Sequence, residues 1–221
     1  MTTAPKDKIL IFIYPKAAAA APDQLLARCG EAFCRQLGDA APARADFSRV
    51  ERPARQKPSF PGAPGIHFSV SHAGDYWVCA FSPRPVGLDL ERVRDYRPGI
   101  ARRFFHPEEA AWLAGRSPGE FFDVWTAKES CVKFWGCGIN GDFSRFSVVA
   151  GDSAGPSDPG KAADTGSRGL AGYAAPPPGS ALAPCRYVHI PFREDYRLCL
   201  CLPAGPGERS GEAIAYEVLF F

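Results

Sequence analysis

The chain has 221 residues, of which 46% are hydrophobic and 23% are charged, as in an ordinary globular protein. Its 26 basic and 24 acidic residues leave a formal net charge of +2, so overall charge indicates neither a nucleic acid nor an acidic membrane as partner. No apolar run approaches the roughly 20 residues of a membrane span, and the run at 9–14 is too short for a signal peptide. These features predict a cytoplasmic protein.

The first part of the chain mixes strands with one helix. The apolar pattern predicts a buried strand at 9–14 and a helix at 23–37. Five basic residues crowd the stretch 44–57, and a Pro/Gly-rich turn region follows it. Alternating apolar residues then predict strands at 66–70 and 76–81.

The second part continues this mixture without regular alternation of strand and helix, which indicates an α+β fold. We expect a strand at 86–91 and another at 143–149, and closing strands at 187–190, 196–202 and 215–219. The expected helices lie around 100–105, from Pro107 onward and at 120–135. Residues 151–184 are rich in Gly, Ala, Pro and Ser and show no periodicity, so we expect a mobile insertion there.

Eight cysteines are spread along the chain, with no C-x-x-C pair and no Cys/His set at zinc spacing. Several of them lie in apolar runs, as at 77–81 and 198–202. Their placement indicates buried free thiols in a reducing compartment.

Two carboxylates share one face of the strand at 86–91. Alternation places Asp89 and Glu91 opposite the apolar residues Val86, Leu88 and Leu90. Two such carboxylates can hold one hard cation. An acidic strand face turned to solvent would give the same pattern.

The helix at 120–135 carries a third acidic residue in an apolar stripe. Glu129 shares its face with Phe122, Trp125 and Val132, and Lys133 follows one turn later. The pair is either a surface ion pair at the edge of a core helix or a third metal ligand and base next to an anion-binding lysine.

The segment 67–74 places Ser71 and His72 at the end of a strand, just before a glycine turn. Such side chains can reach a phosphate or a pyrophosphate. A hydrogen-bonded structural histidine is the alternative interpretation.

Four motifs, in this order, resemble the phosphopantetheinyl transferase superfamily, specifically its Sfp-like group. They are S-H-A-G at 71–74, V-G-L-D-L-E at 86–91, R-F-F-H-P-E-E at 103–109 and W-T-A-K-E-S-C-V-K at 125–133. The resemblance is close from about residue 66 to 149 and thin elsewhere. It implies transfer of the 4′-phosphopantetheine arm of coenzyme A to a serine of an apo acyl or peptidyl carrier protein, with release of 3′,5′-ADP.

The resemblance also implies a fold and a partner. Two similar α+β halves, 1–83 and 84–221, would be related by a pseudo-twofold axis with the active site between them. Because one chain contains both halves, we expect a monomer, with no nucleic-acid or membrane partner. The carrier protein would dock near 100–105, where Phe104 and Phe105 are either contacts or core residues.

The metal and catalytic residues follow from the same resemblance. Asp89, Glu91 and Glu129 would hold Mg²⁺, which would hold the pyrophosphate of coenzyme A. Glu129 would be the base for the carrier serine, and Lys133 would contact the phosphates.

Further residues are expected to bind coenzyme A. Lys57 stands in Gln56-Lys57-Pro58, where the family has G-K-P, and would contact phosphates. His72 would contact the 3′-phosphate with help from Ser71. The usual basic segment of the N-terminal half is missing here, so we expect the stretch 44–57, including Arg55, to replace it.

Two other functions remain open at this point. A metal-dependent phosphoesterase would use the same three carboxylates and lysine, although it would need further ligands for a second metal ion. A catalytically silent family member could instead serve a synthase as a binding partner.

Overall fold

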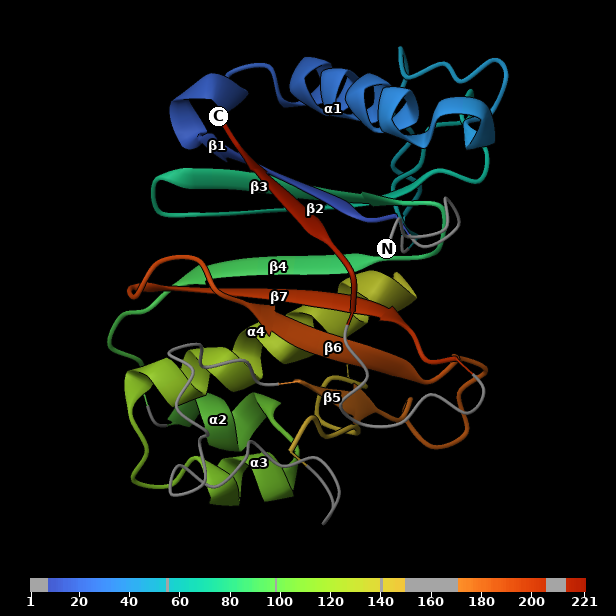
Figure 1. Cartoon of the computed structure of the whole chain (residues 1–221). Coiled ribbons are helices and arrows are strands. Elements are labelled where there is room, and N and C mark those ends of the chain that lie inside the picture. The colour runs from blue at the N-terminus through green and yellow to red at the C-terminus, as the bar shows by residue number, and fades with distance from the viewer. Residues whose placement is uncertain (1–7, 55, 98, 140, 150–170, 206–213) are drawn as a thin grey trace.

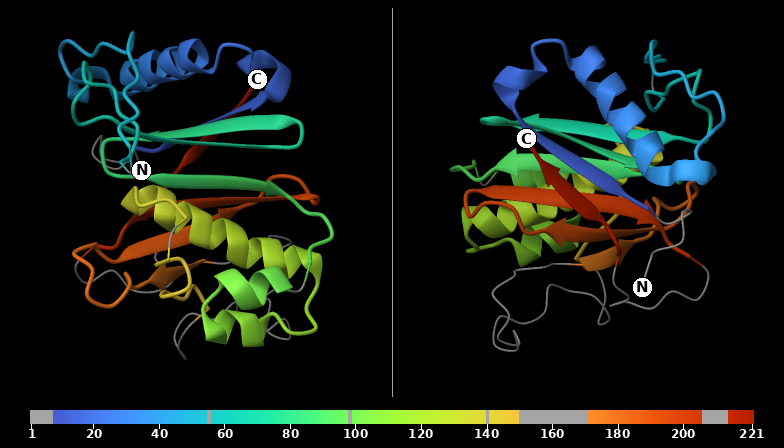
Figure 2. Two further views of the ribbon diagram at one scale, coloured as in Figure 1. Left: turned by 180° about the vertical axis from the view of Figure 1, so that it is seen from behind. Right: turned by 45° about the horizontal axis from the view of Figure 1, so that its top comes forward.

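The structure is a computed structural model that describes residues 8–54, 56–97, 99–139, 141–149, 171–205 and 214–221. It contains two four-stranded sheets stacked face to face, with a helix on the outer face of one sheet and three helices on the outer face of the other (Figures 1 and 2). The α+β class is therefore confirmed.

The first sheet has the strand order β2-β3-β1-β8. Strands β1 (Leu10–Pro15), β2 (His67–Ala73) and β3 (Tyr76–Ser82) pair antiparallel. Strand β8 (Glu217–Phe220) comes from the far end of the chain and pairs parallel with β1. The last strand of the sequence therefore completes the sheet that the first strand begins.

Helix α1 (Pro22–Leu37) covers the outer face of this sheet, between the short 3₁₀ helices η2 (Lys16–Ala19) and η3 (Gly38–Ala40). Its predicted apolar stripe is buried and packs on aromatic residues of the sheet. Burial of this stripe, rather than helix propensity alone, accounts for the stability of the helix.

The second sheet has the strand order β4-β7-β6-β5, and all its neighbours are antiparallel. Its strands are β4 (Gly87–Arg92), β5 (Ala171–Ala174), β6 (Cys185–Ile190) and β7 (Tyr196–Pro203). Alternate residues of β4 and β7 face the first sheet. Together with β1 and β3 they form the apolar core between the sheets, which includes Ile11, Val78, Val86, Leu88, Leu90, Leu198 and Leu200.

Helices α2 (Gly99–Phe104), α3 (Pro107–Trp112) and α4 (Pro118–Trp135) lie on the outer face of the second sheet (Figure 1). The sequence marks both ends of α4. Ser117 and Glu120 form a capping box at its start, and Gly136 adopts a left-handed conformation (φ 76°) at its end. The capping box places the start two residues before the predicted residue 120.

The predicted strand at 143–149 is wrong. Turns occupy this region, and its apolar residues Phe143, Phe146 and Val148 enter the core one by one. Its backbone bonds to buried side chains instead of a neighbouring strand: Lys128 Nζ donates to the carbonyl of Phe146 (2.6 Å), and Val148 N–H donates to Glu109 Oε1 (2.8 Å).

Part of the insertion expected at 151–184, residues 151–170, lies outside the described residues. The other part, 171–184, begins with β5, whose Ala174 is fully buried, and continues with Ala183, whose carbonyl accepts a hydrogen bond from Trp135 Nε1 (2.8 Å). Residues 171–184 are therefore built into the second sheet and against α4, which differs from the expected mobile segment.

The expected boundary at 83/84 falls in the turn between β3 and β4. Strand β8 does not respect this boundary: it comes after the second sheet in the sequence but belongs to the first sheet. Among the described residues, no helix is both long enough and apolar enough to span a membrane.

Candidate active site at the junction of the two sheets

Strand β4 is held between β2 and α4. The hydroxyl of Ser69 on β2 accepts a hydrogen bond from Leu88 N–H (2.9 Å), which ties the edges of the two sheets together. On the other side, Gly87 lets α4 approach closely: a Cβ there would lie 1.9 Å from the carbonyl oxygen of Ser130 and 2.6 Å from the nitrogen of Phe134. A side chain at position 87 would force β4 and α4 apart.

Asp89 is almost fully buried, with 4% of its surface exposed. Its Oδ1 accepts hydrogen bonds from Ser71 Oγ (2.9 Å) and from Lys133 Nζ (2.7 Å). Its Oδ2 is buried and makes no hydrogen bond. Burial raises the pKa of Asp89, while Lys133 and the hydrogen bonds act in the opposite direction. The acidic solvent face that we considered as an alternative is thus wrong for Asp89.

Two further carboxylates add negative charge around Asp89. Burial raises the pKa of Glu129 to about 7, and repulsion from Asp89 and Glu91 adds to the effect. Burial and Asp89 also raise the pKa of Glu91, whose Oε2 accepts a hydrogen bond from Arg94 Nη1 (3.1 Å). The three carboxylates therefore repel one another electrostatically, and a bound cation would stabilise the charged form of each.

Two lysines approach this region from different elements. Lys133 of α4 forms its ion pair with Asp89 of β4. The alternative of a surface ion pair between Glu129 and Lys133 is therefore wrong. Lys57 donates to the carbonyl of Val86, just before β4, and packs over Gly136 at the end of α4. Burial lowers the pKa of Lys57 to about 8.

A cavity of about 420 Å³ opens beside these groups. Lys57, Glu129 and Lys133 lie in its wall, as does Arg52 from the basic stretch. Arg52 also pairs with Asp23 of α1 (Nη1 to Oδ2, 3.0 Å). The rest of the wall is mostly apolar and comes from both halves of the chain, including Leu26, Phe68, Val70, Trp77 and Val132. The cavity can therefore hold an anion at one side and an apolar group at the other.

The acidic groups fit a hard divalent cation. Asp89 Oδ2 is buried without a hydrogen-bond partner and would gain one in a metal ion, which would also offset the repulsion that raises the pKa values of Glu91 and Glu129. The oxygen atoms of the three carboxylates do not all lie within 4.8 Å of one another. In the described part of the chain, only a group of three cysteines has its ligand atoms this close. An open arrangement of this kind suits Mg²⁺, which binds few carboxylates and takes other oxygens from water and phosphate.

Other expected residues lie further from the cavity. Ser71 is directed at Asp89 and so positions that carboxylate. His72 follows on β2 and is exposed. Arg55 lies outside the described residues. Of the two phenylalanines near 100–105, Phe104 is 38% exposed whereas Phe105 is a core residue with 3% exposure.

Lys128 and Glu109 have a role that the sequence did not indicate. Their side chains form a fully buried ion pair (Nζ to Oε2, 2.8 Å) that joins α4 to α3. The ammonium of Lys128 also lies 3.8 Å from the ring centroid of Phe146. The pair anchors the turns at 141–149 to the helix that carries Glu129. Both residues lie inside the quoted motifs, but their 19-residue separation gives no sign that they touch.

Comparison with known proteins adds an independent finding. Residues 85–159 match the model of the 4′-phosphopantetheinyl transferase superfamily, so the resemblance expected from the motifs is confirmed for this segment. The matched residues include β4 and α2–α4, and with them Asp89, Glu91, Glu129 and Lys133.

Individual relatives match over a similar length. The chain is 38% identical over 96 residues to a 4′-phosphopantetheinyl transferase of Bacillus subtilis, and 36% identical over 96 residues to the 4′-phosphopantetheinyl transferase Sfp of Bacillus subtilis (strain 168). Each match covers 42% of this chain and 43% of the relative. The 4′-phosphopantetheinyl transferase gsp of Aneurinibacillus migulanus is 42% identical over 78 residues, which are 34% of this chain and 33% of the relative. The matched segment thus spans less than half the length of these relatives.

Proposed function

We propose that this protein transfers the 4′-phosphopantetheine arm of coenzyme A to a serine hydroxyl of an apo acyl or peptidyl carrier protein. The single observation that carries the proposal is the placement of Glu129. Its carboxylate lies in the cavity wall that also contains Lys57 and Lys133, and its pKa is raised to about 7 by burial and by repulsion from Asp89. A base and two cations around one cavity suit the transfer of a phosphate-linked group.

In this proposal the phosphates of coenzyme A enter the cavity from the side of the lysines. Lys57 and Lys133 supply positive charge there, and Arg52 offers a planar fork of donors in the same wall. The exposed His72 would reach the 3′-phosphate only from outside the cavity wall. Leu26, Phe68 and Trp77 would line the path of an apolar part of the substrate.

Glu129 would take the proton of the carrier serine. The serine oxygen would form a bond to the phosphorus next to pantetheine, and the bond from this phosphorus to the bridging oxygen would break. The electron pair would leave with 3′,5′-ADP. Lys133 would stabilise the developing charge, while Ser71 holds Asp89 in place.

Asp89, Glu91 and Glu129 would together hold Mg²⁺. When bound, this ion would neutralise the pyrophosphate and stabilise the leaving group. Asp89 would bind through Oδ2, since Oδ1 already accepts two hydrogen bonds.

The proposal includes a pseudo-twofold relation between residues 1–83 and 84–221. It is supported by the three antiparallel strands β1–β3 with an outer helix in the first half and the antiparallel strands β4–β7 with outer helices in the second. Strand β8 departs from this relation, because it belongs to the second half but pairs in the first sheet. We also propose that the protein acts as a cytoplasmic monomer without nucleic-acid or membrane partners. The carrier would dock at α2, where Phe104 is exposed.

Incubation with coenzyme A, Mg²⁺ and a panel of apo carrier proteins tests the proposal. We expect one carrier to gain the mass of one phosphopantetheine, and a carrier with Ala in place of the modified serine to gain nothing. Hydrolysis of simple phosphate esters without any carrier mass gain would instead favour a phosphoesterase. Tight carrier binding without transfer would favour a silent binding partner.

A further inference from the structure

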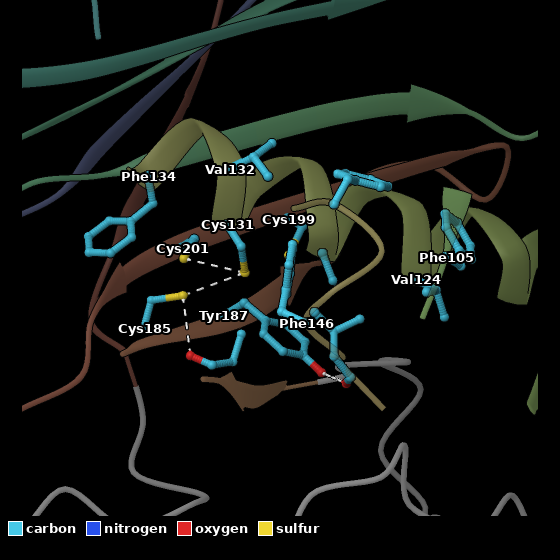
Figure 3. Packing of buried hydrophobic residues seen from close by; sticks show 14 of the residues in the cluster. Phe105, Val124, Cys131, Val132, Phe134, Phe146, Cys185, Tyr187, Cys199 and Cys201 are labelled. Carbon is cyan, nitrogen blue, oxygen red and sulfur yellow. Dashed lines mark hydrogen bonds between the residues drawn. The ribbon is translucent and has the colours of Figure 1, made fainter. Parts of the chain in front are cut away.

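Three cysteine side chains meet in the core behind α4 (Figure 3). Cys131 lies on α4, Cys185 begins β6 and Cys201 lies on β7. All three residues are fully buried, and none of their sulfurs forms a disulfide. The cluster therefore joins α4 to two strands whose cysteines lie 54 and 70 residues from Cys131 in sequence.

The three sulfurs are spaced as metal ligands are. Cys131 Sγ lies 3.6 Å from Cys185 Sγ and 3.8 Å from Cys201 Sγ, and all three sulfurs lie within 4.8 Å of one another. Three sulfurs bound in a plane at about 2.3 Å from one metal ion would lie about 4.0 Å apart. Side-chain shifts of a few tenths of an ångström would therefore bring them to bonding distance.

We propose that Cys131, Cys185 and Cys201 form a three-coordinate site for a soft, thiophilic metal ion, with Cu(I) as the ion that it fits best. The site is separate from the Mg²⁺ site of the proposed function and does not depend on it.

The donor set decides which metal is bound. Thiolate sulfur is a soft ligand that selects Cu(I), zinc and iron–sulfur clusters and disfavours Mg²⁺. Structural zinc is almost always four-coordinate, and in the described part of the chain no fourth Cys, His or carboxylate atom joins the cluster. Three soft donors without a fourth favour Cu(I).

The surroundings suit a bound ion in two ways. The cluster lies in an apolar core that also includes Phe134, Phe146 and Tyr187, and such surroundings exclude water (Figure 3). Each sulfur that binds as a thiolate gives its proton to solvent, and the single positive charge of Cu(I) offsets the charge of one thiolate, which an apolar core disfavours. Binding would tie α4 to β6 and β7 and so stabilise the second half.

Local opening at the edge of the sheet would give a metal ion access to the site. Cys185 pairs in register with Ala174 of β5, and its thiol donates to the carbonyl of Ala174 (3.8 Å). Strand β5 has four residues and is the outermost strand of its sheet. Local opening of a short edge strand needs less free energy than global unfolding. We therefore expect the metal ion to enter slowly but without unfolding of the whole protein.

The test uses the full chain with the half-buried Cys34 and Cys137 replaced by serine, under anaerobic reducing conditions. Cu(I) is supplied as its acetonitrile complex, with bicinchoninate as competing chelator. A second sample is refolded in the presence of Cu(I), which removes any kinetic barrier to entry. We expect one Cu(I) per chain, an ultraviolet sulfur-to-copper band, and X-ray absorption that shows three sulfur neighbours.

Matched variants separate this site from other thiols. Cys185→Ala should weaken Cu(I) binding about 100-fold or more, because loss of even an outer partner of a metal ligand costs about 10- to 100-fold. Cys79→Ala removes an equally buried thiol from the other sheet and should keep full binding. Circular dichroism of each variant, compared with the parent, establishes that it is folded.

The proposal is overturned by three outcomes. The first is a folded parent that loses Cu(I) to bicinchoninate after both loading procedures. The second is a folded Cys185→Ala variant that keeps the parent's affinity. The third is a copper ion with fewer than three sulfur neighbours in the parent, a result that is obtained without any variant of the cluster.

Discussion

Asp89 is almost fully buried, and its two carboxylate oxygens differ. Oδ1 accepts two hydrogen bonds, whereas Oδ2 has no hydrogen-bond partner. We predict that Asp89→Asn lowers kcat/KM for phosphopantetheine transfer about 100- to 1000-fold, because it removes a charge needed for the metal ion and the transition state. Steady-state assays with a responsive carrier measure the loss. Asp95→Asn, an exposed position beyond β4, is the control and should stay near the parent. Turnover of Asp89→Asn within threefold of the parent would contradict the assignment.

The raised pKa of Glu129 makes a prediction about stability and pH. Its pKa is about 7 when folded, against an ordinary value of 4.5, so the folded state binds the extra proton between these values. The resulting stability is complete below about pH 4.5 and is lost as the pH rises through 7. Without metal, Glu129→Gln should therefore be more stable than the parent at pH 8, by about 1 to 3 kcal/mol, and should match it near pH 4.

Urea unfolding in the presence of a chelator measures this difference. Glu31→Gln, at an exposed position of α1, should show no comparable change between the two pH values. A Glu129→Gln variant that is less stable than the parent at pH 8 would show that the carboxylate is stabilised in the folded state rather than strained.

At the scale of elements, the approach of β4 to α4 depends on Gly87. A methyl group at this position would meet two backbone atoms, which cannot rotate away. Gly87→Ala should lower the free energy of unfolding by about 3 kcal/mol. Its transfer activity should fall even where it is folded, because Asp89 would move relative to Glu129 and Lys133. Gly99→Ala is the control, since its Cβ would meet nothing within 4 Å. Equal stability of the two variants would contradict the argument.

The basic stretch 44–57 makes a second prediction at this scale. Lys57 lies in the cavity wall, whereas Arg49 is 77% exposed along its side chain and pairs with Glu51. Lys57→Ala should raise the KM for coenzyme A about 10- to 100-fold and leave that for the carrier nearly unchanged, as expected for loss of a hydrogen bond between charged groups. Arg49→Ala should change neither constant. A defect of Lys57→Ala confined to carrier binding would place the stretch at the carrier interface.

At the scale of the whole molecule, β8 closes the first sheet with the end of the chain. Removal of 217–221 would expose the edge of β1 and take away the ring of Phe221, which stacks on Tyr14 (centroids 4.6 Å apart). We expect Tm to fall by about 5 to 15 °C, since the backbone hydrogen bonds between β8 and β1 are lost. Phe221→Ala keeps the strand and should lower Tm less. Differential scanning calorimetry distinguishes the two, and an unchanged Tm after truncation would show that β8 adds no stability.

Features that depend on local physics could be predicted from the sequence alone. Apolar periodicity and a terminal glycine predicted α4 to within two residues. Strand alternation placed Asp89 opposite Leu88 and Leu90, as the structure has it. The motifs around these elements also predicted the resemblance that was then found for 85–159.

Contacts between residues far apart in the sequence could be identified only from the folded chain. Alternation could not reveal that 143–149 is not a strand, because its backbone is satisfied by the buried side chains of Lys128 and Glu109. The cysteine cluster and the parallel pairing of β8 with β1 likewise join segments far apart in sequence. Spacing along the chain records local geometry, whereas these contacts depend on how helices and sheets pack, and packing is set by the burial of the whole core.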